Sequence, residues 1–275
     1  MRVVFCLVAC ACVLAVALIC AFLFANGLPF FGKVNALDFL LGEKWKPTND
    51  IYGILPMILG SLYITVGAVL FGAPIAVLTS VYMAYFAPKP VLRVLEPAVS
   101  LLAGIPSVIY GLFGLTLLVP FMRETFGGKG FSILTASLLL GMMILPTIIN
   151  VAVSSLRQVP MNYYEGSLAL GATAERSVFR VMLPAASSGV TSGIVLGVGR
   201  AIGETTAVMM VAGNQPRITA DLLKGIRTMT TNIVMEMGYA ADLHREALIA
   251  TGVVLFVFIL LIHMIFSAMK RRTKA

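Results

Sequence analysis

The chain has 275 residues, of which 59% are hydrophobic and only 12% charged, and its mean hydropathy is +0.98. This composition excludes an ordinary soluble domain, because a soluble protein of this size needs charged residues to cover its exterior. The net charge of +8 does not indicate nucleic-acid binding, since the basic residues are scattered in short loops and form no stripe. We therefore expect membrane lipid around the chain and no nucleic-acid partner.

Six apolar runs are long enough to cross a bilayer, which takes about 20 helical residues. They lie near residues 3–25, 58–86, 98–122, 132–156, 187–212 and 247–268. The sequence thus predicts an all-α, polytopic membrane protein with about six transmembrane helices. We divide it into a first helix with an external loop (1–57), a transmembrane domain (58–268) and a basic tail (269–275). The long connections 26–57 and 213–246 should share one side of the membrane.

The first apolar run contains all four cysteines: Cys6, Cys10, Cys12 and Cys20. No His, Asp or Glu accompanies them, so we interpret them as small apolar groups and not as metal ligands. Residues 7–10 look like a lipoprotein cleavage box, but the apolar run before them is too short for a signal peptide. A retained membrane anchor is the favoured interpretation, with a secretory signal as the alternative.

Lys and Arg predict the orientation, because they are more frequent in cytoplasmic loops. Total counts on the two sides are nearly equal, but the basic residues of one side are spread over the two long connections. On the other side, the cluster KRRTK lies directly against the last helix. We therefore expect both termini in the cytoplasm.

Three of the predicted helices contain Gly and Pro together. The pairs are Gly72 with Pro74, Gly104 with Pro106, and Gly141 with Pro146. Such residues are tolerated in membrane helices where neighbouring helices or a cavity satisfy the freed backbone groups. They indicate either ordinary kinks in a packed bundle or bent, mobile helices that line a translocation path.

The stretch 157–186 between the fourth and fifth apolar runs is polar and reads as two short helices. Pro160 is suited to open the first, with Glu165 in its early turns, where the helix dipole favours an anion. Gly171 can end it in a left-handed conformation, and Thr173 can cap the second. The pair Leu183-Pro184 should stop the second helix. The result would be a rigid knob at the membrane surface or an ordinary interfacial hairpin.

The spacing in this stretch resembles the EAA loop of binding-protein-dependent ABC importers. The matching positions are Glu165, Gly171, Val181, Leu183 and Pro184. In that family, the loop is the cytoplasmic element to which an ATPase docks. The resemblance implies a type I ABC importer permease fold, in which ATP hydrolysis belongs to a partner subunit. The docking residues it implies are Glu165, Gly166, Ser167, Ala169, Gly171, Leu183 and Pro184.

Two further stretches indicate which group of ABC importers the chain resembles. Residues 104–114 (GIPSVIYGLFG) and 197–214 (GVGRAIGETTAVMMVAGN) are similar to the permeases of the phosphate ABC importer, and more to the PstC branch than to the PstA branch. This resemblance implies inorganic phosphate as substrate and the bacterial plasma (inner) membrane as location. It also implies three kinds of partner: a second, PstA-like permease, a PstB-like dimer of ATPases and an external, PstS-like phosphate-binding protein.

Arg200 and Glu204 are the most unusual residues of the fifth predicted helix. They are four residues apart and so on one helical face, and a charge at the membrane centre costs about 2.5–3.5 kcal/mol. Gly189, Gly193 and Gly197 share the sector of Arg200, which predicts close approach of another helix. Either the two charges form a salt bridge that fixes packing, or Arg200 binds a passing phosphate and Glu204 is its resting counter-ion.

We regard Arg200 and Glu204 as a candidate substrate path. The two stretches that resemble phosphate importers, 104–114 and 197–214, add two hydroxyl residues to it, Ser107 and Thr205. No enzyme signature accompanies them. The nearest approach to a phosphate-binding loop, residues 27–34, has Val34 where a hydroxyl is required. We expect no catalytic residue, metal or cofactor. The alternatives are an ABC permease for another oxyanion and an ion-coupled secondary transporter, although the latter needs no ATPase dock.

Overall fold

The computed structural model describes residues 1–272. Their regular secondary structure is helical apart from a short hairpin of two antiparallel strands, Trp45–Lys46 (β1) and Ile51–Tyr52 (β2), and loops and turns join these elements. The longest helices coincide with apolar runs of the sequence. They are α1 (Arg2–Gly27), α3 (Leu55–Val81), α7 (Ile133–Arg157), α11 (Ser187–Gly203) and α14 (Asp242–Arg272). The basic tail predicted at 269–275 falls largely outside the part of the chain whose side chains are described.

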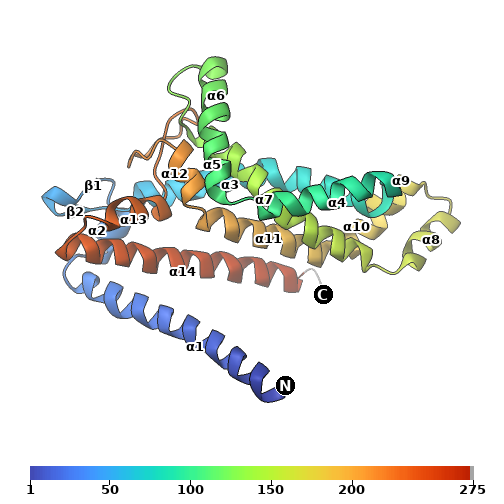
Figure 1. Ribbon diagram of the computed structural model, residues 1–275, viewed down its shortest axis with the longest axis horizontal. Helices are drawn as coiled ribbons and strands as arrows, with labels where there is room; N and C mark the ends of the chain where they lie inside the picture. The colour runs from blue at the N-terminus through green and yellow to red at the C-terminus, as the bar shows by residue number, and fades with distance from the viewer. Residues whose placement is uncertain (273–275) are drawn as a thin grey trace.

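Helices α3 and α7 form the centre of the bundle, with α11 packed against α7 (Figure 1). Glycines allow the close contact: a Cβ on Gly72 would lie 2.8 Å from the carbonyl oxygen of Gly141. Both helices continue unbroken through their internal prolines, Pro74 and Pro146. The Gly and Pro residues of these two helices therefore accommodate packing within the bundle.

The third predicted span, 98–122, is wrong in its boundaries. The chain instead forms an amphipathic helix, α4 (Lys89–Gly104), and a separate membrane-length segment, Ser107–Phe126. That segment consists of α5 (Ser107–Phe113), the π-helical η4 (Gly114–Leu118) and α6 (Val119–Phe126). Ile105 and Pro106 between α4 and α5 are extended, because a proline disfavours the helical conformation in the residue before it.

The fifth predicted span, 187–212, is also divided. Helix α11 ends at Gly203, and α12 (Thr206–Val211) follows after a break. Among the described residues, five helical segments are long and apolar enough to cross a membrane. A sixth span arises if 174–185 and Ser187–Gly203, bent by 70°, are taken together. The expectation of about six spans is therefore confirmed.

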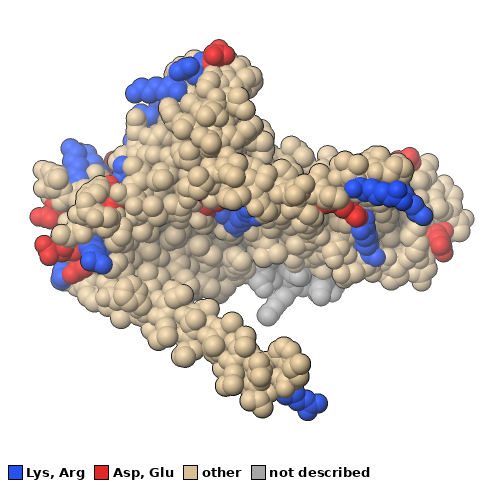
Figure 2. Space-filling view, viewed as in Figure 1, with Lys and Arg blue, Asp and Glu red and all other residues tan. Residues whose placement is uncertain are grey.

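The two long connections meet at one end of the bundle, in an assembly that we call the loop cap (residues 28–57 and 213–246; Figure 1). It contains η1 (Leu28–Gly32), α2 (Ala36–Leu41), the hairpin with η2 (Pro47–Asn49), and α13 (Met229–Met237). Aromatic side chains from the first connection, among them Phe30, Phe39 and Trp45, pack with Met229 of the second. Figure 2 shows charged side chains gathered mainly at this end, over α6 and at the opposite end.

A buried carboxylate, Glu236, joins three separate segments of the loop cap. It accepts hydrogen bonds from the indole N–H of Trp45 and from the guanidinium of Arg227, and it pairs with His244 at 2.9 Å. The side chains of Arg227 and Glu236 are only 12% and 9% exposed. Because a buried charge is tolerated only when it is paired, this cluster holds the loop cap to the start of α14.

We expect Glu236→Ala to destabilise the subunit by about 3–5 kcal/mol, the cost of leaving a buried charge such as Arg227 without its partner. Lys33→Ala is the matched control, because it removes an ion pair whose lysine is 55% exposed, and exposed pairs contribute at most about 1 kcal/mol. Thermal aggregation of the purified subunit in detergent measures both. Equal melting temperatures for the two variants would contradict this assignment.

Helix α1 is almost entirely exposed and contacts the rest of the chain only near its C-terminal end. There Phe24 meets Phe256 of α14 edge to face, and Gly27 lies against Val253. The remaining apolar surface of α1 faces lipid or a partner, since a helix that is apolar all round is not stable in water.

Candidate functional site

The stretch 157–186 forms a helical knob at the end of the bundle opposite the loop cap (Figure 1). Helix α8 (Met161–Ala169) begins directly after Pro160. Gly171 has a φ of 85°, and its N–H donates to the carbonyl of Leu168 at 2.9 Å. The hydroxyl of Thr173 then accepts from the N–H of Arg176 and caps α9 (Ala174–Ser177). The predicted roles of Gly171 and Thr173 are confirmed.

A contact between two serines holds α8 and α9 together. The Ser177 hydroxyl donates to the Ser167 hydroxyl at 2.9 Å, and Ser177 is completely buried. This explains why a small polar residue suits position 167, where a larger side chain would separate the two helices. Sequence reasoning missed Ser177, because nothing in its local pattern distinguishes it from a solvent-facing serine.

Apolar contacts fasten the knob to the helix bundle. After α9, the chain continues through the π-helical η5 (Val178–Met182) and α10 (Leu183–Ala185). Val178 packs with Leu156 of α7 and Val81 of α3, and all three are buried. The Tyr85 hydroxyl adds a hydrogen bond of 2.7 Å to the carbonyl of Leu156. The knob is therefore packed directly against the ends of α3 and α7.

Two details of the predicted knob are wrong. Pro184 does not stop the second helix, because the helix continues to Ala185 and the 70° bend falls at Ala186. A proline in the first turn of a helical segment is compatible with helix, since its missing N–H has no partner to lose there. Glu165 lies in the second turn of α8, beyond the part of the helix where the dipole acts.

The outer surface of the knob is free for a partner. We call it the knob tip, and it comprises Glu165, Gly166, Ala169, Leu170 and Gly171, all exposed. Leu170 is 91% exposed. The carboxylate of Glu165 makes no hydrogen bond or ion pair to any described residue. An exposed leucine beside a free carboxylate on a rigid helical end is typical of a docking element.

Arg200 lies in the last turn of α11 and does not pair with Glu204. The predicted shared face is wrong, because α11 ends at Gly203 and Glu204 has an extended backbone with a ψ of 129°. Arg200 instead donates to the hydroxyl of Thr147 on α7 at 3.2 Å. Neither the structural salt bridge nor the resting counter-ion contact is present among the described residues.

Glu204 lies two residues before α12, and its side chain binds the first turn of that helix. Its carboxylate accepts from the N–H of Ala207 at 3.2 Å, and its carbonyl accepts from the hydroxyl of Thr230. The Thr205 hydroxyl donates to the carbonyl of Gly203. The break between α11 and α12 is thus held by specific hydrogen bonds, as required where backbone leaves a helix inside a membrane protein.

The structure brings together the two stretches that resemble phosphate importers, 104–114 and 197–214. Helices α5 and α12 pack in parallel: a Cβ on Gly111 would lie 3.1 Å from Ala207, and a Cβ on Gly114 would lie 2.8 Å from Val211. Ser107 at the start of α5 and Thr205 before α12 therefore belong to neighbouring helix beginnings, next to the breaks at 105–106 and 204–205. Discontinuous helices of this kind form substrate sites in transporters.

The glycine sector of α11 packs against α7, as expected. A Cβ on Gly193 would lie 3.2 Å from the carbonyl oxygen of Ile148, and one on Gly197 would lie 2.9 Å from the Ile148 side chain. The same approach brings Arg200 to Thr147. The small residues thus determine which helix the charge of Arg200 faces.

The described residues thus form a helical bundle with membrane-length spans and a helical knob at one end, which is the architecture of a polytopic membrane protein. The family model described as "Binding-protein-dependent transport system inner membrane component" matches residues 76–275. The chain belongs to this family.

Named relatives agree with this assignment. The chain is 38% identical to the probable ABC transporter permease protein YqgH of Bacillus subtilis, over 95% of this chain and 89% of the relative. It is 34% identical to the phosphate transport system permease protein PstC of Mesorhizobium japonicum, over 90% and 83%. Among solved structures, it resembles a chain of the MetNI methionine ABC transporter, with a TM-score of 0.67, 19% identity and coverage of 84% and 99%. These matches confirm the ABC importer permease fold.

Proposed function

We propose that this chain is one of two permease subunits of an ATP-driven importer of inorganic phosphate in a bacterial plasma membrane. The observation that carries the proposal is the helical knob with Gly171 in its left-handed conformation, at the end of the bundle opposite the loop cap. The PstC relatives point to phosphate as the substrate. The subunit performs no chemistry, and ATP is hydrolysed on a separate subunit.

The two ends of the bundle suit different partners. We assign the knob tip to a cytoplasmic ATPase dimer of the PstB type, and the loop cap to an external phosphate-binding protein of the PstS type. A second, PstA-like permease completes the membrane part. This arrangement places both termini in the cytoplasm.

Arg200 is the central residue of the proposed substrate path, with Glu204, Thr205 and Ser107 beside the two helix breaks. Its guanidinium donates one side-chain hydrogen bond within the described chain, to Thr147, and so retains donors for an oxyanion. A planar guanidinium can bind two oxygens of a phosphate at once.

Reconstitution of the complete importer tests the function. Proteoliposomes that contain the two permeases and the ATPase, with the binding protein outside, should accumulate phosphate only when ATP is enclosed. An ionophore that removes ion gradients should not stop uptake, and excess sulfate should compete poorly. Uptake driven by an ion gradient without ATP would indicate a secondary transporter, and strong inhibition by another oxyanion would change the substrate.

The proposed orientation predicts the sidedness of labelling. In a background without the four native cysteines, Leu170→Cys should react with a membrane-impermeant thiol reagent only from the cytoplasmic side, and less when the ATPase is bound. Leu41→Cys, 61% exposed in the loop cap, is the control and should react only from outside. The opposite pattern in intact cells would invert the topology.

A further inference from the structure

A polar stripe runs along one face of α7, from the centre of the bundle toward the knob. Each member lies three or four residues from another member, and residues so spaced share a helical face. They are Thr147, Asn150, Ser154, Arg157 and Gln158. The last four are exposed, whereas the apolar residues among them, such as Ala152 and Leu156, are buried. At about 1.5 Å per residue, the stripe is roughly 15 Å long from Thr147 to Arg157.

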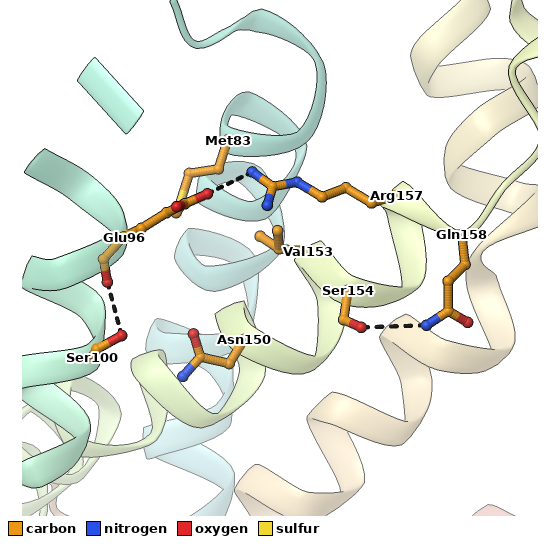
Figure 3. A pocket seen from close by; sticks show the side chains of 8 residues that line it. All are labelled: Met83, Glu96, Ser100, Asn150, Val153, Ser154, Arg157 and Gln158. Carbon is orange, nitrogen blue, oxygen red and sulfur yellow. Dashed lines mark hydrogen bonds and ion pairs between the residues drawn. The ribbon is translucent and has the colours of Figure 1, made fainter. Parts of the chain in front are cut away.

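The stripe borders a cavity of about 490 Å³ between α7 and α4 (Figure 3). Figure 3 shows Arg157 reaching from α7 across this space to Glu96 of α4, at 2.7 Å. The two side chains are 45% and 49% exposed, so the pair is open to solvent or to a partner. All of the lining residues except Met83 and Val153 have polar side chains; the lining comprises Met83, Glu96, Ser100, Asn150, Val153, Ser154, Arg157 and Gln158.

The side chains around the cavity leave hydrogen-bonding groups unused. The Arg157 guanidinium has five N–H donors, of which the structure pairs one with Glu96. The amide of Asn150 makes no hydrogen bond to any described residue. Lipid is a poor neighbour for this face, because an unsatisfied polar group in hydrocarbon costs several kcal/mol. Arg157 could reach the membrane surface with its long side chain, but Asn150 and Ser154 are too short to do so.

The stripe connects the two parts of the proposed machinery. At one end, Thr147 holds Arg200. At the other end, Arg157 and Gln158 lie directly before Pro160, where the knob begins. The polar face of α7 therefore leads from Arg200, the first cationic residue of the proposed path, to Arg157 at the end that we assign to the cytoplasm.

We propose that this stripe, with Glu96 and Ser100 of α4, is the inner part of the oxyanion path, in which Arg157 is a second anion contact. Glu96 competes with the anion for the Arg157 guanidinium and so limits how long the anion stays. The proposal rests on the proposed function and adds these residues to it. Arg157 acts by binding, and no bond is made or broken.

Accessibility to a charged reagent tests the proposal in the assembled importer. Ser154→Cys, in a complex without the native cysteines and embedded in nanodiscs, should react with a sulfonate-bearing thiol reagent. Inorganic phosphate should slow the reaction at least about threefold. Leu70→Cys is the control, because Leu70 is 68% exposed on an apolar face of α3 and should not react with a charged reagent.

Two charge variants separate an anion contact from a structural ion pair, since both break the pair between Arg157 and Glu96. Arg157→Gln should lower phosphate uptake about tenfold at unchanged subunit abundance, and in the Ser154→Cys background it should abolish the protection of the thiol by phosphate. Glu96→Gln should keep or strengthen that protection. Equal behaviour of the two variants would show that the pair only joins α4 to α7 and would overturn the proposal.

The outcomes also separate this proposal from the proposed function. If the parent complex imports phosphate but the thiol introduced by Ser154→Cys does not react, the stripe is buried against the second permease and the proposal is wrong. If phosphate leaves the reaction rate unchanged while uptake is normal, the stripe is wet but binds no anion, and the proposal again fails. A parent complex that imports no phosphate with ATP would refute the proposed function itself.

Discussion

Gly171→Val should reduce phosphate uptake at least about tenfold while the subunit still inserts into the membrane. Gly171 has a φ of 85°, and a Cβ there would meet nothing within 4 Å. Space is therefore not the obstacle. The obstacle is the left-handed backbone, which costs a residue with a side chain about 1–2 kcal/mol and is a marked outlier for a β-branched one. A penalty of about 1.4 kcal/mol already reduces the population of the docking geometry tenfold.

Two variants make this result specific. Gly166→Ala is the matched comparison, because Gly166 lies in α8 just before Gly171, has an equally open surrounding and has no positive φ. It adds one methyl group to the knob tip without strain in the backbone, so it should import much more phosphate than Gly171→Val. Gly171→Asn should fall between the two, since asparagine tolerates the left-handed region better than valine. Uptake, subunit abundance and recovery of the ATPase on purification are measured together. Normal import by Gly171→Val would refute the role of the knob in coupling.

The knob was largely predictable from the sequence because its features are local. A glycine that ends a helix and a threonine that caps the next act within a few residues of the chain, so Gly171 and Thr173 occupy their expected positions. The contact of Ser177 with Ser167 was not predictable, because it depends on how the two short helices fold back on each other.

The membrane spans were predictable in number but not in their interruptions. Apolar residues flank both 105–106 and the polar pair 204–205, so composition alone indicates one helix at each place. Pro106 did indicate the first break, but proline also occurs within unbroken helices here, as Pro74 and Pro146 show. Long-range contacts such as Trp45 with Glu236 and Glu96 with Arg157 join segments far apart in the chain and have no local pattern.

The largest consequence of these interruptions concerns Arg200 and Glu204, which the helical spacing wrongly placed on one face. Since the two are not paired, each should have its own effect on transport. Arg200→Gln should import less than about a tenth as much phosphate as the parent at unchanged abundance. Within the described part of the chain, the Arg200 guanidinium donates a side-chain hydrogen bond only to Thr147, so its remaining donors are free for an oxyanion. Thr147→Val is the comparison variant, because it removes this partner but leaves the charge of Arg200, and it should lower import much less than Arg200→Gln does.

Glu204 requires a variant that separates its charge from its hydrogen bond. Glu204→Gln keeps an oxygen that can accept from the N–H of Ala207, so α12 should still begin correctly while the negative charge is lost. If Glu204→Gln imports poorly at unchanged abundance, the loss of import is caused by the loss of the negative charge. Glu204→Ala loses both, and we expect it alone to lower abundance as well, since loss of a helix cap costs about 1 kcal/mol.

The exchanged variant, Arg200→Glu with Glu204→Arg, decides between a substrate path and packing. A salt bridge that only joined two positions would function in either direction, so exchange would restore import. The structure predicts no recovery, because position 200 lies in a helix beside Thr147 and position 204 lies in an extended segment that caps α12. Phosphate uptake and subunit abundance are compared in the exchanged and single variants. Full uptake in the exchanged variant would leave Arg200 and Glu204 as packing residues and exclude them from the path.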